Sequence, residues 1–322
     1  MTTTLQPQPV LPATTPSPAP EIKKKRRKGT AYETRTLVSP LSLRTWHGKL
    51  IYWTVLVVVV VGFTIAFVFP LYWMVTGALK SGQEIAQTPP TLWPRDPQLQ
   101  NYADAWNNLA LAKLMFNTFY YAAGAVFFQL VFDTAAAYAL SKLRPAFGNV
   151  ILGAMLATLM IPAMVLIVPQ YVTAIDVPIV HLNLLDSPWA IWLPLVANAF
   201  NIFLLKRFFD SIPEDLMAAA QVDGASPLRT LWSIILPMSR PILGVVSIFA
   251  VTAVWKDFLW PKLVMPSPET RTVSVGIYAF AGGTPMNVVI AASVIAAIPT
   301  VIIFLLFQRN IMSGLTTGSL KG

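Results

Sequence analysis

The chain has 322 residues, of which 55% are hydrophobic and 11% are charged, about half the charged share of a soluble globular domain. This composition excludes an ordinary water-soluble protein, because several uncharged runs exceed the roughly 18 apolar residues that mark a membrane-spanning helix. The chain has no cysteine, which excludes disulfides, thiolate nucleophiles and cysteine-based metal sites.

Residues 1–45 differ in composition from the rest of the chain. They begin with a stretch rich in Thr, Pro and Gln that carries no charge before Glu21, and they continue with the basic run Lys23–Lys28. Such a segment cannot bury an apolar core, so we expect a disordered, basic tail. The basic run either anchors the topology or binds anionic lipid heads. We expect residues 46–322 to form one transmembrane domain.

Six apolar runs predict membrane-spanning helices, although Asp133 interrupts the second and only Pro241–Trp255 is uncharged in the fifth. They lie at residues 50–79, 114–140, 149–172, 187–205, 238–261 and 287–308. We therefore expect an all-α, multi-pass membrane protein with about six transmembrane helices. Pro162, Pro169 and Pro299 fall inside these runs, where proline removes a backbone donor and tends to kink a helix. Most of the 23 Lys and Arg residues fall on one side, which places both termini in the cytoplasm.

The segment between the fourth and fifth predicted spans, residues 209–240, carries the signals of two short helices. Ser211 is in position to cap the first helix, with Pro213 tolerated in its opening turn and Glu214 completing a capping box. Gly224 is expected to end this helix, because glycine readily adopts the left-handed conformation that closes a helix.

A second short helix is predicted to begin after Gly224. Ser226 is suited to its N-cap and Pro227 to its first position. The run Ala218–Ala220 makes the preceding helix slim, so that another surface can approach it closely. These patterns predict a rigid, protruding cytoplasmic element, and a loop that folds back onto the bilayer surface is the alternative.

This segment resembles the EAA loop of importer-type ABC permeases, in which Pro is followed by Glu-Ala-Ala, Asp-Gly-Ala and later Leu-Pro. The matching residues are Pro213, Ala219, Ala220, Asp223, Gly224, Ala225, Leu236 and Pro237. Ala218 stands where the family has Glu, which removes one charge from the surface expected to face the ATPase. Glu214 and Asp215 lie one turn earlier and would supply negative charge to the same surface.

Other stretches resemble the carbohydrate-uptake branch of these permeases, as in the maltose system. They are Phe116-Asn117, Pro169-Gln170-Tyr171, Ala253–Pro261 and the C-terminal Gln308–Gly322. The resemblance implies the type I ABC importer permease fold and import of a sugar, a di- or oligosaccharide, across the bacterial cytoplasmic membrane. It also implies two ATP-binding subunits, a second permease subunit and an extracytoplasmic sugar-binding protein as partners, besides membrane lipids.

The expected functional residues fall into two groups. For ATPase coupling, the resemblance indicates residues of the EAA-like loop: Pro213, Glu214, Ala218, Ala219, Ala220, Asp223, Gly224 and Ala225. An uncharged sugar requires aromatic faces and hydrogen-bonding side chains along its path. Such side chains in or near the spans are Asn117, Tyr120, Tyr121, Gln129, Asn198 and Asn201. For each of these, an interhelical hydrogen bond is the alternative.

Charged residues near the spans have simpler interpretations. Lys256 and Asp257 stand where the family has Asn and a polar or acidic residue, and we expect them to pair with each other or to snorkel toward the membrane surface. Asp133 is the one carboxylate well inside a predicted span. It is either functional or paired with a basic neighbour.

Two other classes compete with the importer interpretation. A secondary transporter or channel for a small polar solute would need mid-membrane ionisable groups or inverted repeats, and only Asp133 qualifies. A membrane enzyme would need clustered His, Asp or Glu at one face, whereas His47 and His181 fall on opposite sides. The sequence also lacks the G-x-x-x-x-G-K-[ST] loop that cradles phosphates. We therefore expect no enzymatic activity, cofactor or metal, and energy supplied by a partner.

Overall fold

The computed structural model describes residues 45–316, with side chains as far as Gln308. The predicted N-terminal tail lies outside the described residues, apart from Thr45. The chain divides into two units, residues 1–65 and 66–322, and each is described by itself. Helix α1 (Trp46–Ala78) passes through the boundary between them. Within the first unit its side chains are apolar and mostly exposed, as suits a helix that faces lipid.

The described residues are helical and contain no strand beyond one isolated bridge between Val177 and Leu182. After α1 come α2 (Gly82–Ile85), α3 (Gln100–Asn108), α4 (Leu111–Tyr138), the π-turn η2 (Ala139–Leu143), α5 (Gly148–Thr158), α6 (Ala163–Ile175), α7 (Pro188–Leu195) and α8 (Ala199–Asp210). The rest comprises α9 (Glu214–Val222), α10 (Pro227–Thr230), the π-turn η3 (Leu231–Ile235), α11 (Leu236–Met238), α12 (Arg240–Lys256), α13 (Leu259–Val264), α14 (Val273–Phe280) and α15 (Met286–Thr316). The predicted all-α fold is confirmed.

Three helices of the described part are long and apolar enough to cross a membrane by themselves, namely α1, α4 with η2, and α15. Three further pairs qualify only when both members are taken together, and each pair is bent. The bends are 101° between α5 and α6, 49° between α7 and α8, and 83° between the α10–α11 segment and α12. The number of spans therefore reaches six only if each bent pair counts as one.

The helices predicted at 149–172, 187–205 and 238–261 are each interrupted, and the kink expected at Pro162 is a break between α5 and α6. Pro162 is the N-cap of α6, with φ −59° and ψ 128°, because proline cannot continue the helix that precedes it. Asn198 is extended and caps α8 through its side chain. The fifth run ends at Lys256, before the separate short helix α13. Pro299, in contrast, lies inside α15 without ending it.

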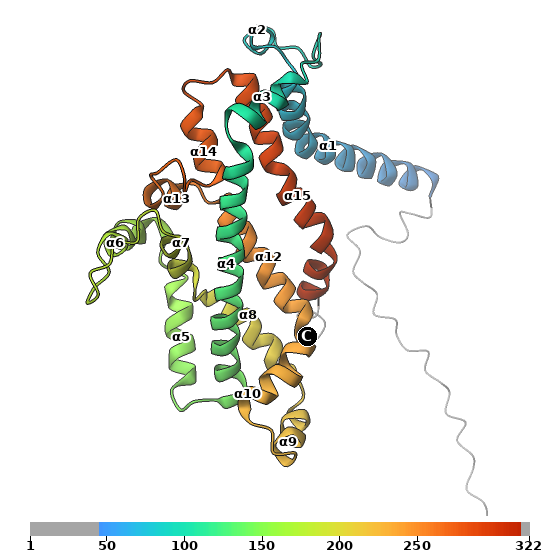
Figure 1. The fold of residues 1–322 in the computed structure, drawn as a ribbon. Helices are drawn as coiled ribbons and strands as arrows, with labels where there is room; N and C mark the ends of the chain where they lie inside the picture. Colours follow the sequence, from blue (N-terminus) through green and yellow to red (C-terminus); the bar gives the residue numbers. More distant parts are fainter. Residues whose placement is uncertain (1–44, 317–322) are drawn as a thin grey trace, which may run out of the picture. The chain divides into compact units, whose positions relative to one another are not determined.

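Helix α4 is the centre of the second unit. It packs against α8, α12, α7, α14 and α3, and α12 packs in turn against α15 (Figure 1). Small buried residues such as Ala122, Ala125 and Ala137 on α4 allow neighbouring backbones to come close, which is how helices associate in lipid. Figure 1 shows α9 and α10 beyond the end of the bundle where α5 and α8 meet, with α3 and α14 near the other end of α4.

Candidate functional site

The first helix of the EAA-like loop forms, but Ser211 does not cap it. Helix α9 begins after Pro213, which has no capping side-chain hydrogen bond. Ser211 lies at the end of α8 instead, and its Oγ donates to the carbonyl of Phe208 at 2.6 Å. The predicted capping box is therefore wrong, because the last turn of α8 offers a free carbonyl and takes the serine hydroxyl first. Glu214 forms an ion pair with Arg144.

The predicted turn between the two short helices is confirmed. Gly224 has φ +71°, and its N–H donates to the carbonyl of Gln221 at 3.0 Å. The next N–H, of Ala225, donates to the carbonyl of Ala220 at 2.9 Å. These two bonds form a Schellman motif, which closes α9 and requires a left-handed residue at the glycine position. Ser226 then caps α10 by accepting from the N–H of Arg229 at 3.3 Å.

The outer face of α9 carries only part of the predicted coupling set. Ala218 and Ala219 are exposed, whereas Ala220 is 5% exposed and Ala225 is half-buried. Ala220 points inward because it lies on the face of α9 that packs against the bundle. The exposed face also carries Val222, which is 88% exposed. Two alanines, not three, therefore offer a slim surface to a partner.

The end of α4 holds the start of α9. The Lys142 ammonium donates to the carbonyl of Ile212 at 2.8 Å, and Arg144 pairs with Glu214. Ile212 itself is buried against the core. These contacts join the turn before α9 to η2 and the residue that follows it. The sequence showed Lys142 and Arg144 only as basic residues that fix the topology, so their anchoring role was missed.

Two more contacts extend this attachment. The hydroxyl of Tyr138 donates to the carbonyl of Pro227 at 3.1 Å, which ties α4 to the start of α10. Ser141 donates to Asp210 at 2.7 Å, and Asp210 also pairs with Lys206 at 2.8 Å. The short helices on both sides of Gly224 are thus connected to the same end of α4.

At the other end of α4, two predicted pathway residues hold a loop. The α13–α14 loop is defined here as residues 265–272. The Asn117 amide donates to the carbonyls of Glu269 at 2.8 Å and Arg271 at 3.0 Å. The Tyr121 hydroxyl donates to the carbonyl of Thr270 at 2.8 Å. Tyr120 is half exposed, with its ring 5.4 Å from that of Trp192.

Asp186 holds the same loop from another direction. Its carboxylate accepts from the N–H and hydroxyl of Ser267 at 3.0 and 2.7 Å, and from the hydroxyl of Thr270 at 2.6 Å. Desolvation raises the pKa of this carboxyl, but the hydrogen bonds from Thr270 and Ser267 outweigh it, so the pKa lies below its ordinary value. The sequence contained no signal for this role, because the three residues are distant in the chain.

The remaining pathway candidates meet in the middle of the bundle. Gln129, Asn198 and Asn201 line a cavity of about 310 Å³ between α4, the α7–α8 break and α12. The Asn201 amide donates to Gln129 at 2.8 Å, and the side-chain oxygen of Asn198 accepts from the N–H of Asn201 at 3.1 Å. The bond between Asn201 and Gln129 joins α8 to α4 and is the interhelical hydrogen bond that was the alternative to substrate contact, whereas Asn198 caps its own helix.

Asp133 belongs to the same network and not to an ion pair. Its Oδ1 accepts from the backbone N–H of Asn198 at 2.9 Å, and its Oδ2 has no hydrogen-bond partner among the described residues. The carboxylate thus joins α4 to the break before α8. Among the described residues, Asp133 forms no ion pair with the basic side chain that was predicted. The backbone N–H of Asn198 is its partner instead.

Comparison with known proteins decides the family. Residues 133–316, more than half of the chain, match the family model described as "Binding-protein-dependent transport system inner membrane component". The chain belongs to this family. The family is one of transport permeases, which favours the importer interpretation over a secondary transporter or a membrane enzyme.

Two relatives of this inner membrane component cover most of its length. The sulfoquinovosyl glycerol transport system permease protein SmoH of Agrobacterium fabrum is 33% identical over 258 residues, which cover 79% of this chain and 89% of the relative. The sn-glycerol-3-phosphate transport system permease protein UgpE of Pectobacterium atrosepticum is 32% identical over 269 residues, covering 80% and 94%.

Solved structures share the fold of the inner membrane component. A chain of a bacterial ABC transporter involved in the import of the acidic polysaccharide alginate aligns with TM-score 0.73 and 25% identity, over 85% of this chain and 99% of that one. A second structure of the alginate transporter, in complex with an alginate pentasaccharide-bound periplasmic protein, aligns with TM-score 0.63 at 14% identity and shows the fold alone. The predicted ABC importer permease and its fold are confirmed.

Proposed function

We propose that this permease carries a carbohydrate, a di- or oligosaccharide, across the cytoplasmic membrane with energy from ATP hydrolysis by partner subunits. Its relatives are named for sulfoquinovosyl glycerol, for sn-glycerol 3-phosphate and for the polysaccharide alginate. The stretches that resemble carbohydrate-uptake permeases support the same substrate class. The chain supplies the passage and the lever, and catalysis belongs to its partners.

The lever in this proposal is α9, the helix that Gly224 ends and that α4 anchors. Helix α9 docks in a groove on one ATP-binding subunit, and closure of the ATPase moves α8 and α12 through the attached ends of the loop. The observation that carries this proposal is the geometry of residues 209–240: a short helix with an exposed alanine face, closed by a Schellman turn and tied at both flanks to α4. Attachment at both flanks lets α9 transmit a movement to the neighbouring helices.

The assembly in this proposal contains two ATP-binding subunits, a second permease subunit and an extracytoplasmic sugar-binding protein. The complex of a relative with a periplasmic protein supports the last of these. Both termini and α9 lie in the cytoplasm, as the distribution of Lys and Arg supports. The sugar passes the cavity of Gln129, Asn198 and Asn201 after entering beside Asn117, Tyr120 and Tyr121.

Gly224 offers the sharpest test of the lever. A Cβ at this position would meet no atom within 4 Å, so a substitution acts through the left-handed backbone and not through crowding inside the chain. Gly224→Val is expected to lower uptake by roughly tenfold or more, since a β-branched residue strongly disfavours positive φ. Gly224→Asn is the matched control, because Asn tolerates this conformation.

The measurement is uptake of radiolabelled di- and oligosaccharides by cells that express the whole importer, with membrane levels of the permease determined by immunoblotting. The proposal expects normal membrane levels for both variants and strong loss of uptake only for Gly224→Val. Full uptake by Gly224→Val would show that the turn does not set the angle of a lever.

A further inference from the structure

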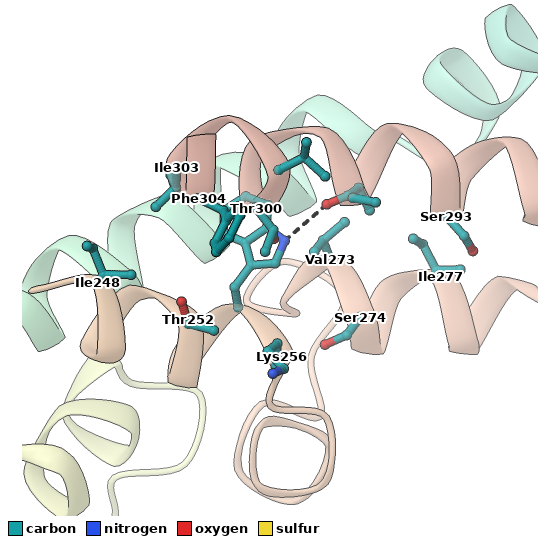
Figure 2. A pocket seen from close by; sticks show the side chains of 14 residues that line it. Ile248, Thr252, Lys256, Val273, Ser274, Ile277, Ser293, Thr300, Ile303 and Phe304 are labelled. Atoms are coloured by element: carbon teal, nitrogen blue, oxygen red, sulfur yellow. Dashed lines mark hydrogen bonds between the residues drawn. The ribbon is translucent and has the colours of Figure 1, made fainter. Parts of the chain in front are cut away.

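A second cavity lies apart from the amide network. It measures about 750 Å³ and lies between α12, α14 and α15 (Figure 2). Most of its lining is apolar, but Thr252, Lys256, Ser274, Ser293 and Thr300 add hydroxyls and one ammonium group. A cavity of this size is in the range that holds a small ligand, with polar groups that fix its orientation.

Lys256 is the last residue of α12, which packs against α15. The neighbouring Trp255 donates its indole N–H to the carbonyl of Ala296 at 3.0 Å. Ala296 is near the middle of the apolar segment Met286–Gln308, about 15 Å from its first residue at 1.5 Å rise per residue. Snorkelling of Lys256 toward the membrane surface stays a prediction.

The predicted pairing of Lys256 with Asp257 is wrong. Lys256 takes part in none of the ion pairs among the described residues. The chain leaves α12 at Asp257, which is its C-cap. The Asp257 Oδ1 accepts from the N–H of Trp260 at 3.4 Å. An ammonium group within a membrane-spanning segment is energetically unfavourable unless it faces a cavity and is paired there.

The hydroxyls around Lys256 suit a polyhydroxylated ligand. Thr252 lies one helical turn before Lys256 on the same face of α12. Ser274 of α14 lines the same cavity, where its hydroxyl donates to the carbonyl of Asp257 at 2.9 Å and lies 3.2 Å from the hydroxyl of Thr272. Figure 2 shows Thr252, Lys256 and Ser274 along one side of the cavity. An ammonium group and hydroxyls in one cavity suit an acidic sugar better than the uncharged sugar expected from the sequence.

We propose that Lys256 binds the anionic group of the transported molecule, so that this permease is selective for a carbohydrate that bears a phosphate, sulfonate or carboxylate. The inference rests on the proposed function, which it narrows to acidic carbohydrates. The ammonium supplies the charge-assisted hydrogen bond, while the hydroxyls of Thr252 and Ser274 contact the sugar. The anion in turn neutralises the positive charge of Lys256, which has no ion-pair partner among the described residues.

The first experiment measures uptake by the whole importer. The probes are sn-glycerol 3-phosphate and a uronate disaccharide, each with its uncharged counterpart, glycerol or a neutral disaccharide. We expect the importer to carry an anionic probe, and Lys256→Met to lower that uptake by roughly tenfold or more, as loss of a hydrogen bond between charged groups predicts. Lys256→Arg is expected to keep most of it. Lys262→Met is the matched control, since Lys262 lies over the ring of Tyr278 and does not line this cavity.

A second experiment separates charge from folding. The chain has no cysteine, so Lys256→Cys creates a single thiol in this subunit. Aminoethyl methanethiosulfonate attaches a primary ammonium to that thiol and is expected to restore uptake of the anionic probe. Methyl methanethiosulfonate attaches an uncharged group and is expected to leave uptake low. The wild-type importer treated with each reagent reports any effect on cysteines of the partner subunits.

The outcomes separate the two proposals. Transport of only the neutral probes, or equal uptake by wild type and Lys256→Met, overturns the anion site and leaves carbohydrate import in place. Loss of partner subunits on purification of Lys256→Met also overturns it, because Lys256 would then pair with an acidic residue of another subunit. Transport of no carbohydrate probe, charged or neutral, contradicts the proposed function itself.

Discussion

The two ends of α4 are both attached to loops, but in different ways. At one end, Asn117 and Tyr121 donate to three consecutive backbone positions of the α13–α14 loop, and Asp186 adds three more hydrogen bonds. At the other end, the attachment of α9 includes an ion pair between Arg144 and Glu214 whose side chains are 66% and 67% exposed.

This difference separates a fixed region from a movable one. Side-chain bonds to successive carbonyls leave a loop almost no alternative position, because each lost bond would leave a polar group unsatisfied. An exposed ion pair contributes little free energy and breaks readily in water. The α13–α14 loop is therefore part of the rigid frame, whereas the attachment of α9 permits small movements without unfolding. The following variants test this contrast.

The largest effect is expected inside the rigid frame, for Gly124→Ala. A Cβ on Gly124 would lie 2.2 Å from the ring of Trp192, which is held by a 3.0 Å hydrogen bond to the carbonyl of Tyr121. Overpacking of this kind is expected to lower the free energy of unfolding by up to about 3 kcal/mol. Thermal unfolding of the purified protein in detergent measures it. Gly153→Ala on α5, which meets nothing within 4 Å, should be neutral or stabilising, and equal melting temperatures for both variants would contradict the contrast.

A smaller effect is expected for Asn117→Leu, which leaves the carbonyls of Glu269 and Arg271 without their donor. We expect a loss of about 1–2 kcal/mol and faster amide hydrogen exchange in residues 269–273. Tyr120→Phe is the control, because its hydroxyl makes no hydrogen bond among the described residues. Unchanged exchange in Asn117→Leu would show that other contacts hold the loop.

The third prediction concerns pH and Asp186. Its pKa is lowered in the folded protein, so its contribution to stability is present above the ordinary value of 3.8 and is lost as pH falls through the lowered value. The wild type should therefore lose thermal stability as the pH falls from 5 toward 3. Asp186→Asn should already be less stable at pH 6 and should lack this component. Parallel pH profiles of the two proteins would argue against a structural role of the carboxylate.

The smallest effect on stability is expected at the α9 attachment. Arg144→Glu and Glu214→Arg should each change the free energy of unfolding by less than about 1 kcal/mol, because both side chains are largely exposed. Their effect on uptake is expected to be larger, a severalfold decrease, since each variant changes the position of α9. The double charge exchange should restore uptake. Failure of the exchange to restore it, with normal membrane levels, would show that the pair does not align the helix.

Local signals in the sequence predicted the parts of the fold that depend on a few adjacent residues. Gly224 and Ser226 act through their own backbone and side-chain conformations, so the turn after α9 was correct. The long helices α1, α4 and α15 followed from long apolar runs, that of α4 despite Asp133. Ser211 was misassigned because two helix ends compete for its hydroxyl. Pro162 was expected to kink a helix, and the structure has a complete break there.

Contacts between distant segments were not predictable in this way. Tyr138, Ser141 and Lys142 reach residues about 70 to 90 positions later in the chain, and nothing in their own sequence neighbourhood indicates the partner. The same limitation applies to Lys256, whose depth depends on how α12 meets α15. Apolar runs place a residue along its own helix but leave its level relative to the neighbouring helices undetermined.

The two π-turns have a mechanical consequence. Turn η2 follows α4 directly, and η3 lies between α10 and α11, so one wide turn precedes α9 in the chain and the other follows it. Each wide turn accommodates one residue more than an α-turn while its backbone bonds stay paired. Conversion of one such turn would rotate the adjoining segment by about 100°. In the proposed mechanism, the two π-turns are the places at which a force on α9 would rotate the adjoining helices.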